Sequence, residues 1–547
     1  MYKLITIFLF VVIFVCACSN DKPDLPVVKR IEIKPDTDAF ILDTLFIDRF
    51  FVRHAPVTKF REPMRSFYEK RDYSSAWINH AGLNEYAGNF INLLSHEQNQ
   101  PATEGIYLMS DIHKMYSRII SARKLPPDSV MREMELLLTV NFFSYASRNW
   151  GGLDDSALKK VSWFVERKRL NYEELLSGYL ANPRLLLNDE PVYRQYTFLK
   201  RELRKYDSIE KNGGWEELRE THLPLKPGAT DSVIPAIKAR LYSMGDLGYN
   251  DGTLLFDSSL ADALAEFQER HGLLADGNIG KKTWEALRVP VRERVRQILI
   301  NMERARWVPA RVAGHYLAVN IPEFKLHVYN DDSLLWSCNV IVGKSEPVFH
   351  TVIFNEEMEY VVFSPYWNIP GNILSMEILP ALRANPGYLQ SHHLEVVDYK
   401  GRNIDASSIN WKSYYDKFPY IIRERPGANN SLGRVKFLFP NPYEIYLHDT
   451  PARSLFKESS RAFSHGCIRV EEPFRLAQFV LGDDTGWTAE KIMQKMVAEK
   501  EEFVKIRKKI PVYLVYFTAF VDRSGRLNFR NDVYGHDEKM KNLLFVN

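Results

Sequence analysis

Cysteine is scarce in this chain. The sequence has 547 residues but only four cysteines, Cys16, Cys18, Cys338 and Cys467. So few cysteines cannot form the disulfide framework of small exported domains, and the cores must therefore depend on hydrophobic packing. A hydrophobic fraction of 45% and an aromatic fraction of 13% can supply such cores and exclude a disordered protein. A chain of this length is expected to divide into about two to four domains.

An excess of one charge is also missing. Basic residues number 72 and acidic residues 69, so the formal net charge is +3, and the two signs are interspersed along the chain. Domains that bind nucleic acid usually carry a basic patch or run. This composition therefore predicts no nucleic-acid partner.

The N-terminus carries a short apolar run. Lys3 precedes an apolar run from Leu4 to Val15, which is short for a membrane-spanning helix and typical of a signal peptide. A small residue directly before Cys18 resembles a bacterial lipobox, which implies that Cys18 is the lipidated first residue of the mature protein. We predict a lipoprotein signal peptide over residues 1–18 and a flexible tether over 19–55. The alternative is a plain cleaved signal peptide.

Two helical regions follow the tether. Residues 56–228 are rich in helix formers with apolar faces, and we predict a helical scaffold domain there. Residues 229–290 form a shorter helical unit that resembles the three-helix peptidoglycan-binding domain. The resemblance rests on Phe267-Gln268, His271-Gly272-Leu273 and the turn from Asp276 to Thr283. This unit either binds glycan or serves only as a packing module.

The pattern changes to short strands after a linking helix at 292–306. Strands are predicted at 315–321, 324–329, 334–342, 351–363 and 443–448. Regular short strands with turn signals indicate a β-sandwich or barrel-like domain, which we place at 291–520.

The strand-rich domain contains a long polar and aromatic insertion at about 372–432. An insertion of this length is usually functional, and we interpret it as a lid over Cys467. Farther along, Thr488 is predicted to cap a charged helix that reaches Ile510. Residues 511–521 are predicted to form a final strand. Residues 521–547 are assigned to a C-terminal tail.

Cys467 lies in the run Ser464-His465-Gly466-Cys467-Ile468-Arg469-Val470, nineteen positions after His448. A thiolate is the attacking form of cysteine, and a neighbouring imidazole can generate it. Gly466 lets the backbone approach a reacting carbonyl, where amide N–H groups can stabilise an oxyanion. The run therefore predicts a thiol nucleophile, with His448 and His465 both candidates for its base.

Residues 315–520 resemble the catalytic domain of the L,D-transpeptidases. The resemblance rests on Tyr446-Leu447-His448-Asp449-Thr450-Pro451 and on the run that contains Cys467. The order of helical scaffold, peptidoglycan-binding unit and lidded catalytic domain is similar to the large subfamily of these enzymes. The resemblance implies a multidomain α+β protein whose catalytic domain is mainly β.

In that family, a cysteine attacks the third residue of a peptidoglycan tetrapeptide stem and releases D-alanine. The side-chain amine of a second stem then attacks the thioester and gives a 3→3 cross-link. The resemblance implies that Cys467 is the nucleophile and His448 the general base, oriented by the backbone carbonyl of Asp449. The amides of His465, Gly466 and Cys467 would form the oxyanion hole.

The resemblance also implies partners and a location. The partners would be peptidoglycan stem peptides and glycan, with a membrane reached through the lipid anchor, in a bacterial periplasm. No cofactor and no metal are implied, and the oligomeric state stays open.

Further residues are candidates for substrate binding. Arg469 has a planar guanidinium that suits a substrate carboxylate, although in such a loop it often has a structural role. Ser464 lies in the same run. Tyr366, Trp367 and Asn368 precede the lid and either line the donor cleft or belong to the core.

Other functions use the same residues. With water as acceptor, the site would be an L,D-carboxypeptidase or a cross-link hydrolase, and with a vestigial site the chain would be a wall-binding lipoprotein. Zinc could bind His448, His465 and Cys467, but a fourth ligand at suitable spacing is missing. A papain-like protease has its Cys before its His and a different local signature. Cys338, in a strand-like run, is expected to be a buried free thiol.

Overall fold

The structure is a computed structural model that describes residues 39–97, 109–121, 127–167, 169–182, 190–415 and 417–545. The predicted signal peptide and its lipidation site, Cys18, lie outside these ranges. Within them, no helix combines the length and the apolar character needed to cross a membrane. The chain forms two compact units, Met1–Ser144 with Asn171–Asn188, and Tyr145–Leu170 with Asp189–Asn547.

The first unit is mainly helical, with a small sheet of order β1-β2-β3. Its elements are β1 (Ala39–Ile41), α1 (Thr44–Arg53), α2 (Arg61–Glu69), β2 (Ser74–Asn79), β3 (Gly82–Leu83), α3 (Glu85–Glu97), α4 (Met109–Ile120), α5 (Asp128–Ala146) and α7 (Tyr172–Ala181). The tether predicted to extend to residue 55 is therefore wrong from Ala39 onward. Phe50 and Phe51 of α1 are buried, and these aromatic side chains make the segment part of the core.

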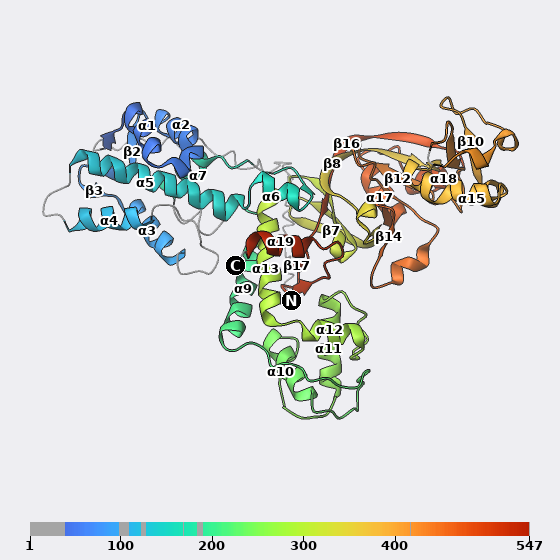
Figure 1. The fold of residues 1–547 in the computed structure, drawn as a ribbon, viewed down its shortest axis with the longest axis horizontal. Helices are drawn as coiled ribbons and strands as arrows, with labels where there is room; N and C mark the ends of the chain where they lie inside the picture. The colour runs from blue at the N-terminus through green and yellow to red at the C-terminus, as the bar shows by residue number, and fades with distance from the viewer. Residues whose placement is uncertain are drawn as a thin grey trace, which may run out of the picture. The chain divides into compact units, whose positions relative to one another are not determined.

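The second unit begins with short elements and continues with helices that include a three-helix bundle (Figure 1). Its helices and first strand are α6 (Asp155–Lys160), β4 (Trp163–Phe164), α9 (Gln195–Lys211), α10 (Ile234–Met244), α11 (Ser258–Arg270), α12 (Lys281–Arg288) and α13 (Val291–Trp307). In the chain, α9 precedes the three-helix bundle and α13 follows it. The bundle of α10, α11 and α12 confirms the predicted three-helix domain. Leu241, Leu264 and Trp284 form part of its core. Gln268 fastens the predicted turn, because it donates to the Asn278 carbonyl (2.8 Å) and accepts from Gly277 N–H (2.8 Å).

A closed β-structure carries Cys467. Its strands are β5 (His315–Asn320), β6 (Lys325–Asn330), β7 (Ser333–Gly343), β8 (Ile353–Phe363), β12 (Val435–Leu438), β13 (Leu447–His448), β14 (Ala462–Ser464), β15 (Ile468–Val470) and β16 (Glu502–Val515). The strand order β12-β13-β15-β7-β6-β5-β16-β8 closes into a ring because β12 also pairs with β8. The prediction of a mainly β, barrel-like catalytic domain is confirmed.

Strand alternation separates the two faces of this barrel. Fully buried side chains fill its interior: Leu317, Val319, Leu326, Val340, Val435, Phe437, Leu447 and Ile468. His448 follows Leu447 on β13, and Arg469 follows Ile468 on β15, so both point to the outer face. Cys338 on β7 is a buried free thiol, as expected from the sequence.

The insertion at about 372–432 folds around its own core. It contains α14 (Gly371–Ile373), α15 (Leu379–Ala384), α16 (Tyr388–Ser391), β10 (Leu394–Val397) and β11 (Ile421–Glu424), and β11 pairs with β9 (Trp367–Asn368). Leu379, Leu382, Val396 and Ile422 are buried together in this insertion. In Figure 1 its elements α15 and β10 lie at one end of the barrel. The helix α18 (Ala489–Met496) follows later in the chain.

The charged helix predicted to reach Ile510 is much shorter. Thr488 does cap α18, because its hydroxyl accepts from Lys491 N–H (3.3 Å), but α18 ends at Met496. Residues from Glu502 form β16, which pairs with both β5 and β8. Val504 and Ile506 have branched side chains that favour strands, and the charged residues Lys505 and Arg507 are exposed.

The segment assigned to a C-terminal tail is folded. β17 (Ala519–Val521) pairs with β18 (Leu527–Phe529), and α19 (His536–Leu544) follows. The buried guanidinium of Arg304 on α13 donates to Asp537 of α19 (2.6 Å), and Thr518 donates to the same carboxylate (2.6 Å). This ion pair holds the end of the chain against the domain that carries Cys467. The helix α17 (Pro473–Leu481) also belongs to this unit.

Removing this carboxylate tests the anchor. Asp537→Ala leaves the buried Arg304 guanidinium without its partner, and we expect the free energy of unfolding to fall by about 3–5 kcal/mol. The neighbouring exposed Glu538 is the matched control, and Glu538→Ala should change the free energy of unfolding by less than about 0.5 kcal/mol. Urea unfolding of both variants measures the difference. Equal stability of the two would contradict the anchor.

Candidate active site

The pairing of two short strands brings the predicted nucleophile and base together. β13 pairs in parallel with β15, in the register Leu447↔Ile468 and His448↔Arg469. Since side chains alternate along a strand, Tyr446 and His448 share one face with Cys467 and Arg469. The Ile468 N–H donates to the Tyr446 carbonyl (3.0 Å) and fixes this register next to the sulfur.

Cys467 rests as a neutral thiol. Burial raises its pKa to about 11, against the lowering effect of contacts with the backbone and side chain of Tyr446. The Glu444 charge raises this pKa further, and the Arg469 charge lowers it. The thiol lies 3.6 Å from the Glu444 carbonyl oxygen, its hydrogen-bond acceptor. The sulfur must therefore lose its proton during the reaction.

His448 is buried and has a fixed orientation. Its Nδ1 lies 2.6 Å from the Asp449 carbonyl oxygen, which requires the proton on Nδ1 and makes Nε2 the nitrogen with the lone pair. Burial, together with the positive charge of Arg469, lowers the pKa of His448 to about 3. The imidazole is therefore neutral at neutral pH, as a general base must be.

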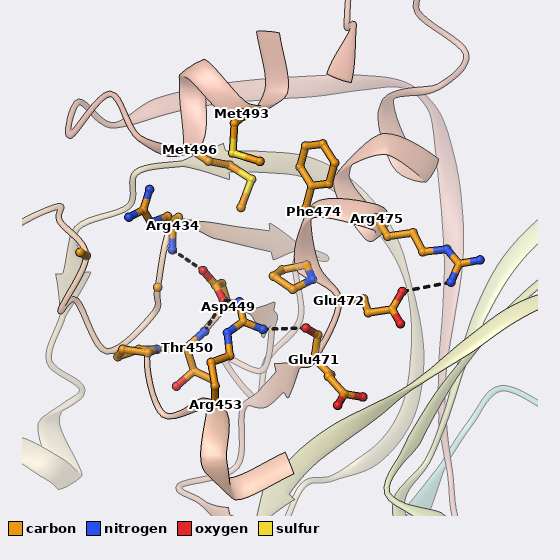
Figure 2. Close-up of a pocket in the computed structure, with 14 residues that line it drawn as sticks. Arg434, Asp449, Thr450, Arg453, Glu471, Glu472, Phe474, Arg475, Met493 and Met496 are labelled. Atoms are coloured by element: carbon orange, nitrogen blue, oxygen red, sulfur yellow. Dashed lines mark hydrogen bonds and ion pairs between the residues drawn. The ribbon is translucent and has the colours of Figure 1, made fainter. Parts of the chain in front are cut away.

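The backbone around Asp449 is held rigidly (Figure 2). One carboxylate oxygen of Asp449 accepts from Thr450 N–H (2.7 Å) and from the Arg453 guanidinium (2.5 Å), and the other accepts from Arg434 N–H (2.8 Å). A Cβ on Gly433 would lie 2.4 Å from the Asp449 carboxylate, so only glycine fits there. These contacts fix the carbonyl that orients His448.

The carboxylate of Asp449 borders a cavity of 540 Å³. Phe474, Met493 and Met496 form its apolar wall, as Figure 2 shows. Cys467 does not line this cavity, nor a second one of 430 Å³ against the outer face of β5, β6 and β16. The cavity in Figure 2 therefore lies behind the base and does not hold the reacting atoms.

His465 is placed differently from His448. Its Nε2 lies 2.8 Å from a carboxylate oxygen of Glu377, in the insertion, and 3.4 Å from Nζ of Lys344. Its ring and that of Phe349 pack edge to face. A carboxylate of the insertion and a cation thus contact the imidazole that would compete with His448 for the role of base.

The loop before Cys467 has two free amide donors. The Gly466 N–H donates to the Ser464 hydroxyl (3.1 Å), and that hydroxyl donates to the Cys467 carbonyl (2.6 Å). Within the described residues, the amides of His465 and Cys467 make no hydrogen bond. These two remain available for an oxyanion, whereas Gly466 and the buried Ser464, expected to serve the substrate, hold the loop together.

Arg469 has an unused guanidinium. Its Nε is buried and lacks a hydrogen-bond partner among the described residues, and burial lowers its pKa. A buried polar atom without a partner is costly unless a ligand meets it. Arg469 therefore fits the predicted role as a receptor for a substrate carboxylate.

The three residues before the insertion are only partly at the site. Trp367 interacts with the Tyr446 hydroxyl, which also meets the sulfur. Tyr366 lies under the Arg423 guanidinium, 3.8 Å from ring centre to carbon, and its N–H donates to Glu501 (3.0 Å). Asn368 is exposed on β9 and pairs with Arg423 of β11.

Sequence reasoning missed several residues of the site. Lys436 of β12 lies opposite His448, and Tyr446 meets the sulfur. The period of two along β13 places Tyr446 and His448 on one face and could have identified Tyr446. Lys436 and Glu377 reach the site only through tertiary pairing and carry no local signal. Among the described residues, no cluster of His, Cys, Asp and Glu could hold a metal ion.

Three segments of the chain match known families. Residues 314–501 match the L,D-transpeptidase catalytic domain, residues 62–203 a scaffold domain, and residues 230–287 the "Putative peptidoglycan binding domain". A Haemophilus influenzae protein named "Putative L,D-transpeptidase" is 36% identical over 251 residues, which are 46% of this chain and 50% of that protein. The match thus spans about half the length of this curated relative.

Solved structures were also compared. An L,D-transpeptidase from Xylanimonas cellulosilytica is 12% identical, with 54% of this chain and all of that chain covered and a TM-score of 0.18. One from Stackebrandtia nassauensis is 13% identical, with 54% and 97% covered and a TM-score of 0.21. Likenesses this low support no conclusion about this chain.

The neutral thiol predicts how the reactivity of Cys467 depends on pH. Because its pKa is raised to about 11, the thiolate fraction is small at pH 7 and should grow about tenfold per pH unit up to pH 10. Iodoacetamide labelling, followed by peptide mass spectrometry, should show this rise at Cys467. The buried Cys338, with a pKa raised to about 12, should stay unlabelled. A labelling plateau between pH 6 and 8 would instead indicate a thiolate–imidazolium pair.

Proposed function

We propose that this chain, whose segments match an L,D-transpeptidase catalytic domain, a peptidoglycan-binding domain and a scaffold domain, forms 3→3 cross-links in peptidoglycan. The observation that carries the proposal is the shared face of β13 and β15, which holds a thiol, a neutral imidazole and an unpaired guanidinium. These are the groups needed to attack an acyl carbon and to hold a carboxylate beside it.

The first half-reaction would form a thioester. As the Cys467 sulfur attacks the carbonyl of the third stem residue, Nε2 of His448 takes the thiol proton. The amides of His465 and Cys467 stabilise the oxyanion. When the tetrahedral intermediate collapses, the His448 imidazolium returns the proton to the departing amine of D-alanine.

The second half-reaction would transfer the acyl group. The side-chain amine of a second stem attacks the thioester, and His448 takes a proton from that amine. The thiolate leaves and regains the proton from the imidazolium, which restores the neutral pair. With water in place of the amine, the same steps would trim the stem. The acceptor in this second half-reaction, an amine or water, therefore distinguishes a transpeptidase from a carboxypeptidase.

The rest of the chain supports action at the cell wall. The three-helix domain matches the peptidoglycan-binding family, and we propose that it brings the catalytic domain to its polymer. A protein that acts on peptidoglycan works outside the cytoplasm, so we propose a periplasmic location with Cys18 as the lipid anchor. Stem peptides and glycan would be its partners in cell-wall biogenesis and cell shape.

Muropeptide analysis tests the proposed reaction. A protein of residues 19–547 is incubated with disaccharide-tetrapeptide, and the products are identified by mass spectrometry. We expect a tetra–tri dimer and free D-alanine, both absent with Cys467→Ala, because the nucleophile is gone. Cys338→Ala is the matched control, since this buried thiol lies away from the site, and it should keep the wild-type products.

The products also separate the alternatives. Tripeptide without dimer would favour a carboxypeptidase, and cleavage of added 3→3 dimers a cross-link hydrolase. No product from a protein shown to be folded would contradict enzymatic activity and favour a wall-binding lipoprotein.

A comparison of two imidazoles tests the base. His448→Gln should lower kcat about 100-fold to 10,000-fold, because no group then accepts the thiol proton. His465→Gln should lower kcat less than about tenfold, because that side chain is engaged with Glu377 and Lys344. Steady-state kinetics of D-alanine release measures both variants. A larger loss for His465→Gln would assign the base to His465.

A further inference from the structure

The C-terminal segment reaches the loop that carries the nucleophile. Tyr534 lies between β18 and α19, beyond the matched catalytic domain at 314–501, and its side chain is buried. Its hydroxyl donates to the Gly343 carbonyl (2.8 Å) and accepts from Thr351 N–H (3.3 Å). One phenol thus joins the end of β7 to the residues just before β8.

Thr351 continues this contact to the residue before Cys467. Its side chain is buried, and its hydroxyl donates to the Gly466 carbonyl (2.7 Å) and accepts from Gly343 N–H (2.9 Å). A path of two hydrogen bonds therefore leads from Tyr534 through Thr351 to Gly466.

The Gly466 carbonyl belongs to the peptide unit that carries the Cys467 N–H. A peptide unit is planar and trans, so its carbonyl and its N–H point in opposite directions, and fixing one fixes the other. The Cys467 N–H is one of the two amides left free for an oxyanion. A hydrogen bond at the Gly466 carbonyl therefore sets the direction in which the Cys467 N–H points.

Little room exists for this arrangement to move. Gly466 has a φ of +119°, and a Cβ there would lie 3.6 Å from the His350 carbonyl oxygen. A Cβ on Gly343 would lie 1.9 Å from the Phe349 carbonyl oxygen, which no side chain could tolerate. The segment from Phe349 to Thr351 is thus packed directly against both glycines.

Tyr534 is itself held on several sides. The His350 ring stacks on its ring with the centroids 4.0 Å apart. Its N–H donates to the Tyr516 hydroxyl (2.8 Å), and that hydroxyl donates to Asp532 (2.7 Å). The phenol is therefore a fixed support for Thr351.

We propose that Tyr534 is a positioning residue for the nucleophile loop, which acts through Thr351 to aim the Cys467 N–H at the oxyanion. This inference rests on the proposed acyl transfer. It assigns a catalytic support to a segment outside the matched catalytic domain.

Kinetics of hydroxyl-deletion variants test the path. In the protein of residues 19–547, Tyr534→Phe and Thr351→Val should each lower kcat for D-alanine release about tenfold, with KM changed less than twofold. Iodoacetamide labelling of Cys467, which needs no oxyanion hole, should change less than twofold. Thr351→Ser keeps the hydroxyl and should restore most of kcat. Tyr513→Phe is the matched control, a tyrosine on the barrel outside this path, and should keep the wild-type kcat.

A double variant tests whether the two residues act in one path. Tyr534→Phe with Thr351→Val should lower kcat no more than Thr351→Val alone, because Tyr534 acts through Thr351. Losses that multiply, or a wild-type kcat for Tyr534→Phe, would overturn the proposal.

Hydrogen exchange gives a readout that does not depend on turnover. Amide exchange in peptides that cover residues 464–467 should be faster in Tyr534→Phe and unchanged in Tyr513→Phe. Unchanged exchange in Tyr534→Phe would overturn the positioning role even if the wild-type protein had no transpeptidase activity. Absence of wild-type turnover together with the expected exchange would instead count against the proposed reaction alone.

Discussion

The parallel pairing of β13 with β15 is the constraint on which the site depends. Each strand contributes only a few residues, yet their register places His448 beside Arg469 and Tyr446 beside Cys467. A slip of one residue would turn one pair of side chains into the barrel interior, where Leu447 and Ile468 are fully buried. The apolar core thus specifies the chemistry on the outer face.

The same pairing explains the electrostatics of the site. Arg469 and Lys436 both flank His448, and with burial they hold the imidazole in its neutral form. The positive charges of Arg469 and Lys436 disfavour protonation of His448 as long as no anion neutralises them. A substrate carboxylate that meets the unpaired guanidinium of Arg469 would supply that anion and make proton transfer to His448 easier when substrate is bound. Substrate binding and activation of the nucleophile would then be linked through one charge.

Local sequence signals predicted much of this arrangement. The alternation of apolar residues located β5 to β8, and the resemblance carried by Phe267-Gln268 and the turn from Asp276 to Thr283 located the three-helix domain. The run around Cys467 identified the nucleophile because a cysteine, an imidazole and a glycine happen to lie together in this short segment of the chain.

Other parts of the site depend on contacts between distant segments. Glu377, Lys436 and Thr351 meet the nucleophile loop only after the barrel closes, so no local pattern marks them. The charged residues of β16 are also typical of the exposed face of a helix, so the sequence of this segment alone predicts a helix. Its pairing with β5 and β8 makes it a strand. No local pattern marks Asp537 of α19 as buried either, because its partner, Arg304 of α13, is distant in the chain.

The place of β16 in the barrel has a consequence for the order of assembly. This strand lies between β5 and β8, although it follows both by more than a hundred residues in the chain. A chain that emerges from its N-terminus can fold the helical unit and the three-helix domain early, but its barrel stays open until β16 arrives. The nucleophile therefore gains its ordered surroundings among the last events of folding, so a chain cut short before β16 would carry Cys467 without a finished site.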